Sequence, residues 1–438
     1  MGHLAAKDIY GELEEKIDGL WMRKPAKKSF YELLKLLYTE VEARMVVSMP
    51  FGFARLSRIA KLSGMKEADA LPILESLADK GLVLDVAPKG YTYYIPSPIV
   101  IGIFEFTMMR TDRGVDHKSL ARLFQDCMLG DGALFAANFT KDSKMSVMRT
   151  LPHESAVRPE QYVEILDYEK AASLVETFDT FSLGICSCRH KKHHLNEKEC
   201  DVPLASCLSF GIAADYLIRR KLSKRVSKEE ILESLKLSVD KGMVLNADNT
   251  RRGIRFICQC CSCCCTMLGG VAKYGYSNAL ITSSFIASIR DKDCTGCGKC
   301  VKACPINAIA LVPAERTEGI KRKKKAVVDE NICLGCGVCA LSCKSRALGL
   351  EKRPQKVIHP ATTFERVILQ TLDKGTLANQ IFDNPHSLTQ KTMRAVLGGF
   401  LRLPPVKQAL MSEALRSRFL TAMRAGIRLQ GKGWLLEI

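Results

Sequence analysis

Apolar positions in the first hundred residues follow a helical period and then change to strict alternation. Between residues 10 and 48 they recur at helical spacing and predict two helices. Residues 54–62 and 66–80 predict two further helices, separated by a Ser-Gly turn. Residues 82–95 alternate on both sides of a Lys-Gly pair, which predicts a two-stranded hairpin.

The order helix, turn, helix, hairpin predicts a winged-helix-like domain, which we place within residues 1–106. Such domains often bind DNA, with the second helix in the major groove. Here the segment 66–80 carries four acidic residues and only two lysines. DNA phosphates repel an acidic helix. We therefore expect a structural or protein-binding module and do not expect nucleic acid as a partner.

The patterns after residue 106 are weaker but divide the chain. Residues 107–160 contain scattered glycine and proline and predict a linker or crossing segment. Residues 161–284 mix strand and helix patterns with many cysteines, residues 285–352 hold two short cysteine-rich runs, and residues 353–438 are helical and basic. Within 161–284 we expect a strand from residue 162 and helices over 208–222 and 228–241, the last opened by a capping box at Ser227 and Glu230. The predicted fold class is α+β and multidomain: a winged-helix-like domain, a mixed α/β cysteine-rich domain, a small cysteine-run domain and a helical C-terminal tail.

Composition places these domains in a reducing compartment. The chain has 438 residues, 47% of them hydrophobic, and 19 cysteines. The first residues do not form a secretory signal, so we expect a cytoplasmic protein whose cysteines are ligands before they are disulfides. Apolar runs are too short for a membrane-spanning helix.

The net charge of +18 favours an acidic partner. Residues 390–438 contribute nine Lys or Arg against two Glu, interleaved with apolar residues. This segment has three interpretations: contact with an anionic membrane surface, docking on a partner protein, or a helical cap on the preceding domain.

Two cysteine runs share the spacing C-x2-C-x2-C-x3-C. They are Cys294, Cys297, Cys300, Cys304 and Cys333, Cys336, Cys339, Cys343. The doubled spacing is typical of bacterial two-cluster ferredoxins, in which three cysteines of one run and the fourth of the other hold each [4Fe–4S] cluster. A zinc site needs only four ligands and does not require these offsets, so iron–sulfur clusters are favoured.

We expect two crossed ligand sets. One is Cys294, Cys297, Cys300 and Cys343; the other is Cys333, Cys336, Cys339 and Cys304. Glycines at positions 296, 298, 335 and 337 allow the backbone to turn close to the cluster. Lys344 stands where a second proline is usual. A basic run, Lys321–Lys325, lies between the cysteine runs and is either a solvated loop or a docking patch for an acidic redox partner.

Ten more cysteines lie upstream. They are Cys186, Cys188, Cys200 and Cys207, followed by Cys258, Cys260, Cys261, Cys263, Cys264 and Cys265. The last six exceed the four ligands of one cubane, so they either divide between two sites or include spare thiols. One or two further [4Fe–4S] clusters are favoured. The alternative is a zinc site that combines Cys186 and Cys188 with His190, His193 and His194. Arg189 and these histidines are either a solvated basic loop or tune a cluster.

Taken together, the C-x-C-R motif at 186–189, the block 258–265 and the paired runs resemble a family of large 4Fe–4S dicluster ferredoxin-domain proteins of anaerobes. In that family the block reads C-x-C-C-x-C-x-C, matched by Cys258, Cys260, Cys261, Cys263 and Cys265. Cys264 falls at an open position of the motif and is expected to be spare. The resemblance implies electron transfer without specifying a substrate.

The sequence thus predicts a multi-cluster iron–sulfur protein that relays single electrons between a low-potential donor and a partner oxidoreductase. A carrier or electron-transfer subunit is favoured over a stand-alone enzyme. Two other functions remain open. One is a redox- or oxygen-sensing winged-helix transcription regulator. The other is an enzyme whose cluster at 258–265 binds a substrate.

Overall fold

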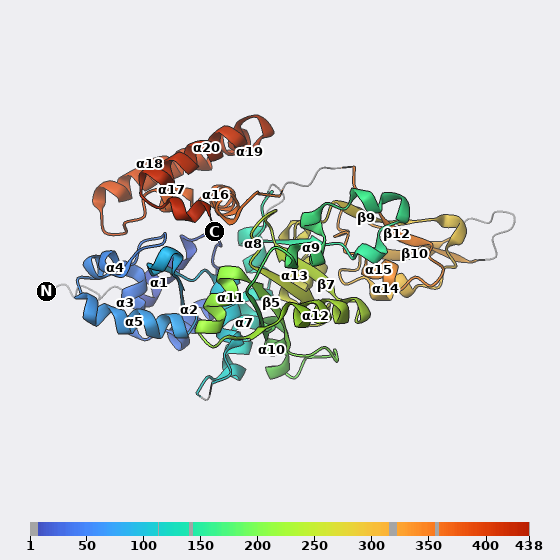
Figure 1. Cartoon of the computed structure of the whole chain (residues 1–438), viewed down its shortest axis with the longest axis horizontal. Coiled ribbons are helices and arrows are strands. Elements are labelled where there is room, and N and C mark those ends of the chain that lie inside the picture. Colours follow the sequence, from blue (N-terminus) through green and yellow to red (C-terminus); the bar gives the residue numbers. More distant parts are fainter. Residues whose placement is uncertain (1–7, 113, 140–142, 315–321, 355–358, 438) are drawn as a thin grey trace. The chain divides into compact units, whose positions relative to one another are not determined.

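The computed structural model describes residues 8–112, 114–139, 143–314, 322–354 and 359–437 (Figure 1). The chain divides into two compact units. The first, called here the helical unit, comprises Met1–Asn138, Tyr216–Leu222 and Thr362–Ile438. The second, called the thiol unit, comprises Phe139–Asp215 and Ser223–Ala361 and contains every cysteine except Cys127.

The helical unit begins with three helices where we predicted two. They are α1 (Ile9–Asp18), α2 (Lys28–Leu37) and α3 (Glu40–Ser48). The extra boundary arises at Thr39, whose side chain accepts a hydrogen bond from the backbone of Glu42 while Glu42 accepts one from Thr39. This capping box starts a new helix inside a continuous apolar pattern.

The next elements have the predicted order. They are α4 (Leu56–Ser63), α5 (Glu67–Asp79) and the antiparallel pair β1 (Val83–Val86) and β2 (Tyr93–Pro96). Gly64 ends α4 with a left-handed backbone (φ 70°). The winged-helix interpretation rests on this order of elements.

The acidic side of α5 is paired within the helical unit. Arg220 contacts the carboxylates of Glu75 at 2.8 Å and Asp79 at 2.9 Å. It also contacts Asp85 on β1 at 2.9 Å, and Arg219 contacts the other oxygen of Asp85. Part of the acidic character of this helix therefore serves an internal ion-pair network.

Residues 107–160 do not form the linker that we expected. Helices α6 (Phe104–Met109), α7 (His117–Leu129) and α8 (Ala133–Asn138) belong to the helical unit, and β3 (Met148–Leu151) belongs to the thiol unit. Leu120, Phe124 and Met128 lie four residues apart on α7 and are buried, which is the pattern of a core helix. The glycines that suggested a linker lie in the turn between α7 and α8.

The C-terminal region is helical, as predicted. It comprises α16 (Thr363–Lys374), α17 (Leu377–Ile381), α18 (Leu388–Arg402), α19 (Pro404–Met411) and α20 (Glu413–Leu429). These helices belong to the helical unit. Thr376 donates a hydrogen bond to the carbonyl of Leu20 at 2.8 Å, and Asp383 pairs with Arg58 at 2.6 Å. In the described part of the chain, no helix is both long enough and apolar enough to cross a membrane.

A six-stranded antiparallel sheet organises the first part of the thiol unit. Its order is β3-β7-β8-β5-β4-β6. The strands besides β3 are β4 (Phe181–Ile185), β5 (Ala205–Phe210), β6 (Ser223–Val226), β7 (Val244–Asp248) and β8 (Phe256–Cys260). The helices are α9 (Ala171–Val175), α10 (Ser187–His194), α11 (Gly211–Arg219), α12 (Lys228–Asp240) and α13 (Thr266–Tyr274).

Two local predictions here were wrong. The strand expected from residue 162 is a short 3-10 turn, Pro159–Glu164. The helix expected from Leu208 begins at Gly211, because Leu208 and Phe210 are taken up by β5. The capping box at Ser227 and Glu230, by contrast, starts α12 as predicted.

The sheet has one apolar face and one face rich in thiols. Leu208, Leu245 and Ile257 join Ile231 and Leu235 of α12 in one buried hydrophobic cluster. Side chains alternate along a strand, so the residues between them face the other way. Those residues include Cys207 and Cys258, which are direct cross-strand partners. The apolar face thus anchors the sheet and presents the thiols on the opposite side.

The cysteine-run domain is built from two similar halves. The first half contains β9 (Phe285–Ile289), α14 (Lys299–Ala303) and β10 (Ile309–Pro313). The second half contains β11 (Lys324–Val328), α15 (Val338–Leu341) and β12 (Leu348–Lys352). Antiparallel pairing of β9 with β12 and of β10 with β11 locks the halves together.

The ion pairs of Asp85 give a prediction about stability. Asp85 is 1% exposed and accepts contacts from two arginines. Replacing Asp85 by Ala leaves these guanidinium groups without their buried anion and should lower the free energy of unfolding by about 3 kcal/mol. Asp79→Ala is the matched control, because Asp79 contacts the same Arg220 but is largely exposed, and it should cost under about 1 kcal/mol. Urea unfolding followed by circular dichroism measures the free energy of unfolding of both variants. Equal losses of stability in the two variants would contradict the conclusion that burial makes the Asp85 ion pairs important.

Candidate metal centres

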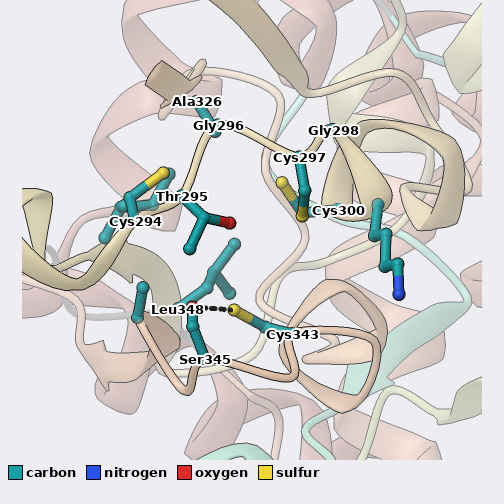
Figure 2. A pocket seen from close by; sticks show the side chains of 13 residues that line it. Cys294, Thr295, Gly296, Cys297, Gly298, Cys300, Ala326, Cys343, Ser345 and Leu348 are labelled. Atoms are coloured by element: carbon teal, nitrogen blue, oxygen red, sulfur yellow. Dashed lines mark hydrogen bonds between the residues drawn. The ribbon is translucent and has the colours of Figure 1, made fainter. Parts of the chain in front are cut away.

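The first crossed set of cysteines lines one pocket. Cys294, Cys297, Cys300 and Cys343 line a hollow that is partly open to solvent. Figure 2 shows the three cysteines of the first run on one loop and Cys343 approaching from the other half of the domain. Thr295, Lys299 and Leu348 are among the other residues that line it. The structure therefore brings together the four thiols that the sequence grouped. We call this hollow the outer pocket.

The second crossed set lines another pocket in the same way. Its thiols are Cys333, Cys336, Cys339 and Cys304. The remaining lining is mostly apolar, including Ala287, Ile306 and Leu334. We call this hollow the inner pocket.

Glycine is required where each run turns. At Gly296 (φ 70°) an added Cβ would lie 2.1 Å from the carbonyl oxygen of Lys324. At Gly335 (φ 69°) it would lie 2.0 Å from the carbonyl oxygen of Phe285. Each cysteine loop thus lies directly against a strand of the other half of the domain.

An arginine fixes each run at its first cysteine. Arg353 donates to the carbonyl of Cys333 at 2.7 Å, and Arg322 donates to the carbonyl of Cys294. Arg322 also pairs with Asp291 at 2.6 Å. Of the basic run, Lys321 lies outside the described residues, and Arg322 is a structural residue rather than part of a solvated loop.

The two pockets differ in exposure. Cys297 in the outer pocket is exposed, and the backbone N–H of Lys299 lowers the pKa of its thiol. Cys333, Cys336 and Cys339 in the inner pocket are buried, and burial raises the pKa of Cys336 to about 12. The thiols of the outer pocket are therefore more exposed than most of those of the inner pocket.

The upstream cysteines divide into two sets. The larger one, called the face set, lies on or beside the thiol face of the sheet and comprises Cys186, Cys188, Cys207, Cys258, Cys260 and Cys265. Cys188 and Cys260 each form a hydrogen bond with Cys265. A hydrogen bond with Cys260 lowers the pKa of Cys258, but burial and the electrostatic interaction with Cys207 and Cys186 raise this pKa overall. Burial raises the pKa of Cys186 to about 12.

Unpartnered polar atoms surround the face set. Asn246 is the direct cross-strand partner of Cys258 and is completely buried. Its Oδ1 accepts from Thr150, but its Nδ2 has no acceptor among the described residues. The Oγ of buried Ser182 on β4 is likewise without a partner there. Buried donors in this state are suited to hydrogen bonding with the sulfides of a bound cluster.

The smaller set lies where β8 ends and is called the turn set: Cys200, Cys261, Cys263 and Cys264. Their sulfur atoms all lie within 4.8 Å of one another. Cys200 is 3.7 Å from Cys261 and 3.8 Å from Cys264, and Cys263 is 3.6 Å from Cys261 and 3.5 Å from Cys264. Cys264, which we expected to be spare, is a full member of this set. The expectation was wrong because it came from motif positions, whereas the turn after β8 directs adjacent thiols to one point.

Two buried cations from α10 lie beside these sets. Arg189 is completely buried and donates to the Gln259 carbonyl at 3.0 Å and to the Cys261 sulfur at 3.5 Å. A hydrogen bond with Cys264 and the Arg189 guanidinium lower the pKa of Cys261. Lys191, also completely buried, donates to Thr266, which contacts the Cys188 sulfur. The solvated-loop interpretation of this segment is therefore wrong for Arg189 and Lys191.

The histidines of α10 have other partners. His190 and His194 contact each other through their Nε2 atoms at 2.9 Å, and His193 stacks edge-on against His194. Among the described residues, no group of ligand atoms joins these histidines to Cys186 and Cys188. This counts against the mixed zinc site that we considered.

A chain of buried contacts joins the inner pocket to the upstream sets. The backbone N–H of His153 donates to the carbonyl of Cys336 at 3.0 Å, and its ring donates to the carbonyl of Met243 at 2.7 Å. The sulfur of Met243 lies 3.8 Å from the Arg189 guanidinium, which reaches Cys261. Nothing in the sequence identified His153 or Met243, because neither lies in a motif.

Comparison with known proteins agrees with this geometry. A family model described as a 4Fe-4S dicluster domain matches residues 293–347. No curated protein and no solved structure matches the chain. The match covers both cysteine runs but only a small part of the chain, so it identifies the domain and not the whole protein.

The chain therefore contains a 4Fe-4S ferredoxin-type domain. Such a domain binds [4Fe–4S] clusters and indicates iron–sulfur electron transfer in general.

The close approach at Gly335 gives a second prediction. A Gly335→Ala methyl group would overlap the Phe285 carbonyl and strain a left-handed backbone, so the inner pocket should lose its iron, about four atoms per chain. Gly275→Ala is the matched control, because Gly275 has nearly the same φ (73°) with nothing within 4 Å of an added Cβ. Iron analysis of anaerobically purified protein distinguishes the variants, and full iron in Gly335→Ala would contradict the assignment.

Proposed function

We propose that the protein is a multi-cluster electron carrier that relays single electrons between a low-potential donor and a partner oxidoreductase. The observation that carries this proposal is the sequence of centres: an exposed pocket, a buried pocket and a buried contact path to further thiols. Clusters bound at these centres supply one-electron chemistry. The residues of the chain determine where an electron can enter and leave.

The donor sets fit such clusters. In each ferredoxin pocket four thiols from two loops surround a hollow, with glycines that keep side chains out of it. We assign Cys294, Cys297, Cys300 and Cys343 to the outer cluster and Cys333, Cys336, Cys339 and Cys304 to the inner cluster.

The face set supports a third [4Fe–4S] cluster. It offers more thiols than the four that a cubane needs, and buried Lys191 balances the negative charge of a thiolate-bound cluster. Asn246 and Ser182 supply the hydrogen bonds that usually surround cluster sulfur. Because thiols are in excess, an iron left open for substrate is not required, and the enzyme alternative has no observation in its favour.

The outer pocket suits an acidic redox partner. Lys299 lines the pocket and is exposed. Lys323, Lys324 and Lys344 are also exposed; the first two precede the second cysteine run in the sequence, and the third directly follows it. Exposed positive charge around an accessible centre steers an acidic protein to the surface where the distance between the two redox centres is shortest. The donor or acceptor therefore docks at the outer pocket.

The regulator alternative is less well supported. The helix that would enter the DNA groove carries acidic residues, and Arg220 holds two of them in an internal network. Neither feature favours contact with phosphates.

Iron content tests the proposal directly. Anaerobically purified protein should contain about twelve irons per chain, four for each ferredoxin pocket and four for the face set. Cys297→Ser and Cys336→Ser should each change the electron paramagnetic resonance signal of a different cluster in the reduced protein, whereas Cys127→Ser, a buried thiol in the other unit, should change neither. An iron content of about eight atoms per chain would contradict a cluster at the face set. Unchanged spectra in both Cys297→Ser and Cys336→Ser would contradict the whole proposal.

The C-terminal helices support a peripheral membrane contact. On α18, Met393, Val396 and Phe400 recur at helical spacing and are exposed, and so is Leu403 directly after the helix. An exposed apolar stripe on a basic helical segment suits an anionic bilayer surface. Full-length protein should co-sediment with vesicles that contain anionic lipid and not with neutral ones, and a Val396→Glu, Phe400→Glu variant should bind at least tenfold less. Equal sedimentation of both proteins would exclude this surface.

A further inference from the structure

The turn set has the dimensions of a site for one metal ion. A zinc ion bound by four thiolates at about 2.3 Å in a tetrahedron holds neighbouring sulfur atoms roughly 3.8 Å apart. Four of the six sulfur–sulfur separations in the turn set run from 3.5 to 3.8 Å, and all six are within 4.8 Å. These distances match one central ion.

The same distances leave no space for a cubane. A [4Fe–4S] cluster takes one thiolate at each of four irons, so its core separates the ligands. In each of the two ferredoxin pockets, by contrast, the four thiols line a hollow. Among the described residues, the turn set is brought within 4.8 Å, whereas neither ferredoxin set appears in such a close group.

We propose that Cys200, Cys261, Cys263 and Cys264 bind a single zinc ion. This site is separate from the clusters of the proposed function. Binding converts the four thiols to thiolates and releases their protons to solvent, with no change in oxidation state.

Local structure and charge support this site. The backbone N–H of Cys265 donates to the carbonyl of Cys261 at 3.1 Å, which closes the turn that carries three of the ligands. Zinc with four thiolates bears a net charge of −2, and burying that charge requires compensation. The buried Arg189 guanidinium lies 3.5 Å from the Cys261 sulfur and provides it.

The proposed ion has a structural role. Zinc does not change oxidation state, so the turn set does not accept electrons. It fastens the loop at Cys200 to the end of β8, immediately after Cys258 and Cys260 of the face set. The site thereby holds the strand that presents two of the thiols proposed for the third cluster.

Metal analysis and zinc X-ray absorption on the anaerobically purified full-length protein test the proposal. The wild type should contain about one zinc per chain, with an absorption fine structure of four sulfur atoms at about 2.3 Å. Cys264→Ser and Cys263→Ser should each lose most of the zinc and keep the iron of the ferredoxin pockets. Cys127→Ser is the control and should keep both metals.

The outcomes separate this proposal from that of function. A wild type without zinc, with Cys264→Ser losing about four irons, would place a cubane in the turn set and overturn the proposal. One iron in place of zinc, or zinc retained at full occupancy in Cys264→Ser, would also overturn it. Loss of iron from the ferredoxin pockets concerns the electron-transfer proposal alone, because those ligands are different residues.

Discussion

The structure depends on one electrostatic constraint: thiolates cannot be crowded together inside a protein unless positive charge lies among them. Burial already raises the pKa of Cys186 and Cys336 to about 12, so these groups stay protonated unless a metal replaces the proton. The thiol unit gathers all but one of the cysteines of the chain. So many thiols close together are expected of a set of metal ligands and are not expected of ordinary side-chain packing.

The fold meets this constraint by separating apolar and thiol functions on one sheet. Ile257 and Cys258 are neighbours on β8, yet one belongs to the hydrophobic cluster with α12 and the other pairs with Cys207 on the opposite face. The apolar face supplies the stability, about 25 cal/mol for each Å² buried. The thiol face can then hold groups that contribute little to folding by themselves. Arg189 and Lys191 of α10 provide the positive charge that such a face requires.

Spacing along the chain predicted the ferredoxin-type domain because its ligands lie on short loops of fixed length. The glycines between those cysteines were also predictable, since their left-handed conformations follow from the tight turns. The upstream region was different. The division between Cys260 and Cys261 occurs because β8 ends there, and no periodicity in a run of cysteines marks the end of a strand. Cys200 joins residues more than sixty positions away, which is a tertiary contact that local patterns do not contain. The helices at 107–138 were missed because glycine at a turn resembles glycine in a linker.

The contact path from Cys336 through His153 and Met243 to Arg189 links the two parts of the thiol unit physically. His153, Met243 and Arg189 on this path are at most 2% exposed, so the path runs through the interior of the thiol unit. Arg189 also contacts the carbonyl of Gln259, which lies between Cys258 and Cys260 of the face set. The guanidinium therefore lies between both upstream sets. If the turn set holds zinc, Arg189 compensates a fixed charge. Under the proposed function, the electron that leaves the inner pocket would then have the face set as its destination. The block 258–265 would then supply ligands to two different sites, a structural zinc ion and a redox cluster, with Arg189 near both. This would explain why the block contains more thiols than a single cluster can use.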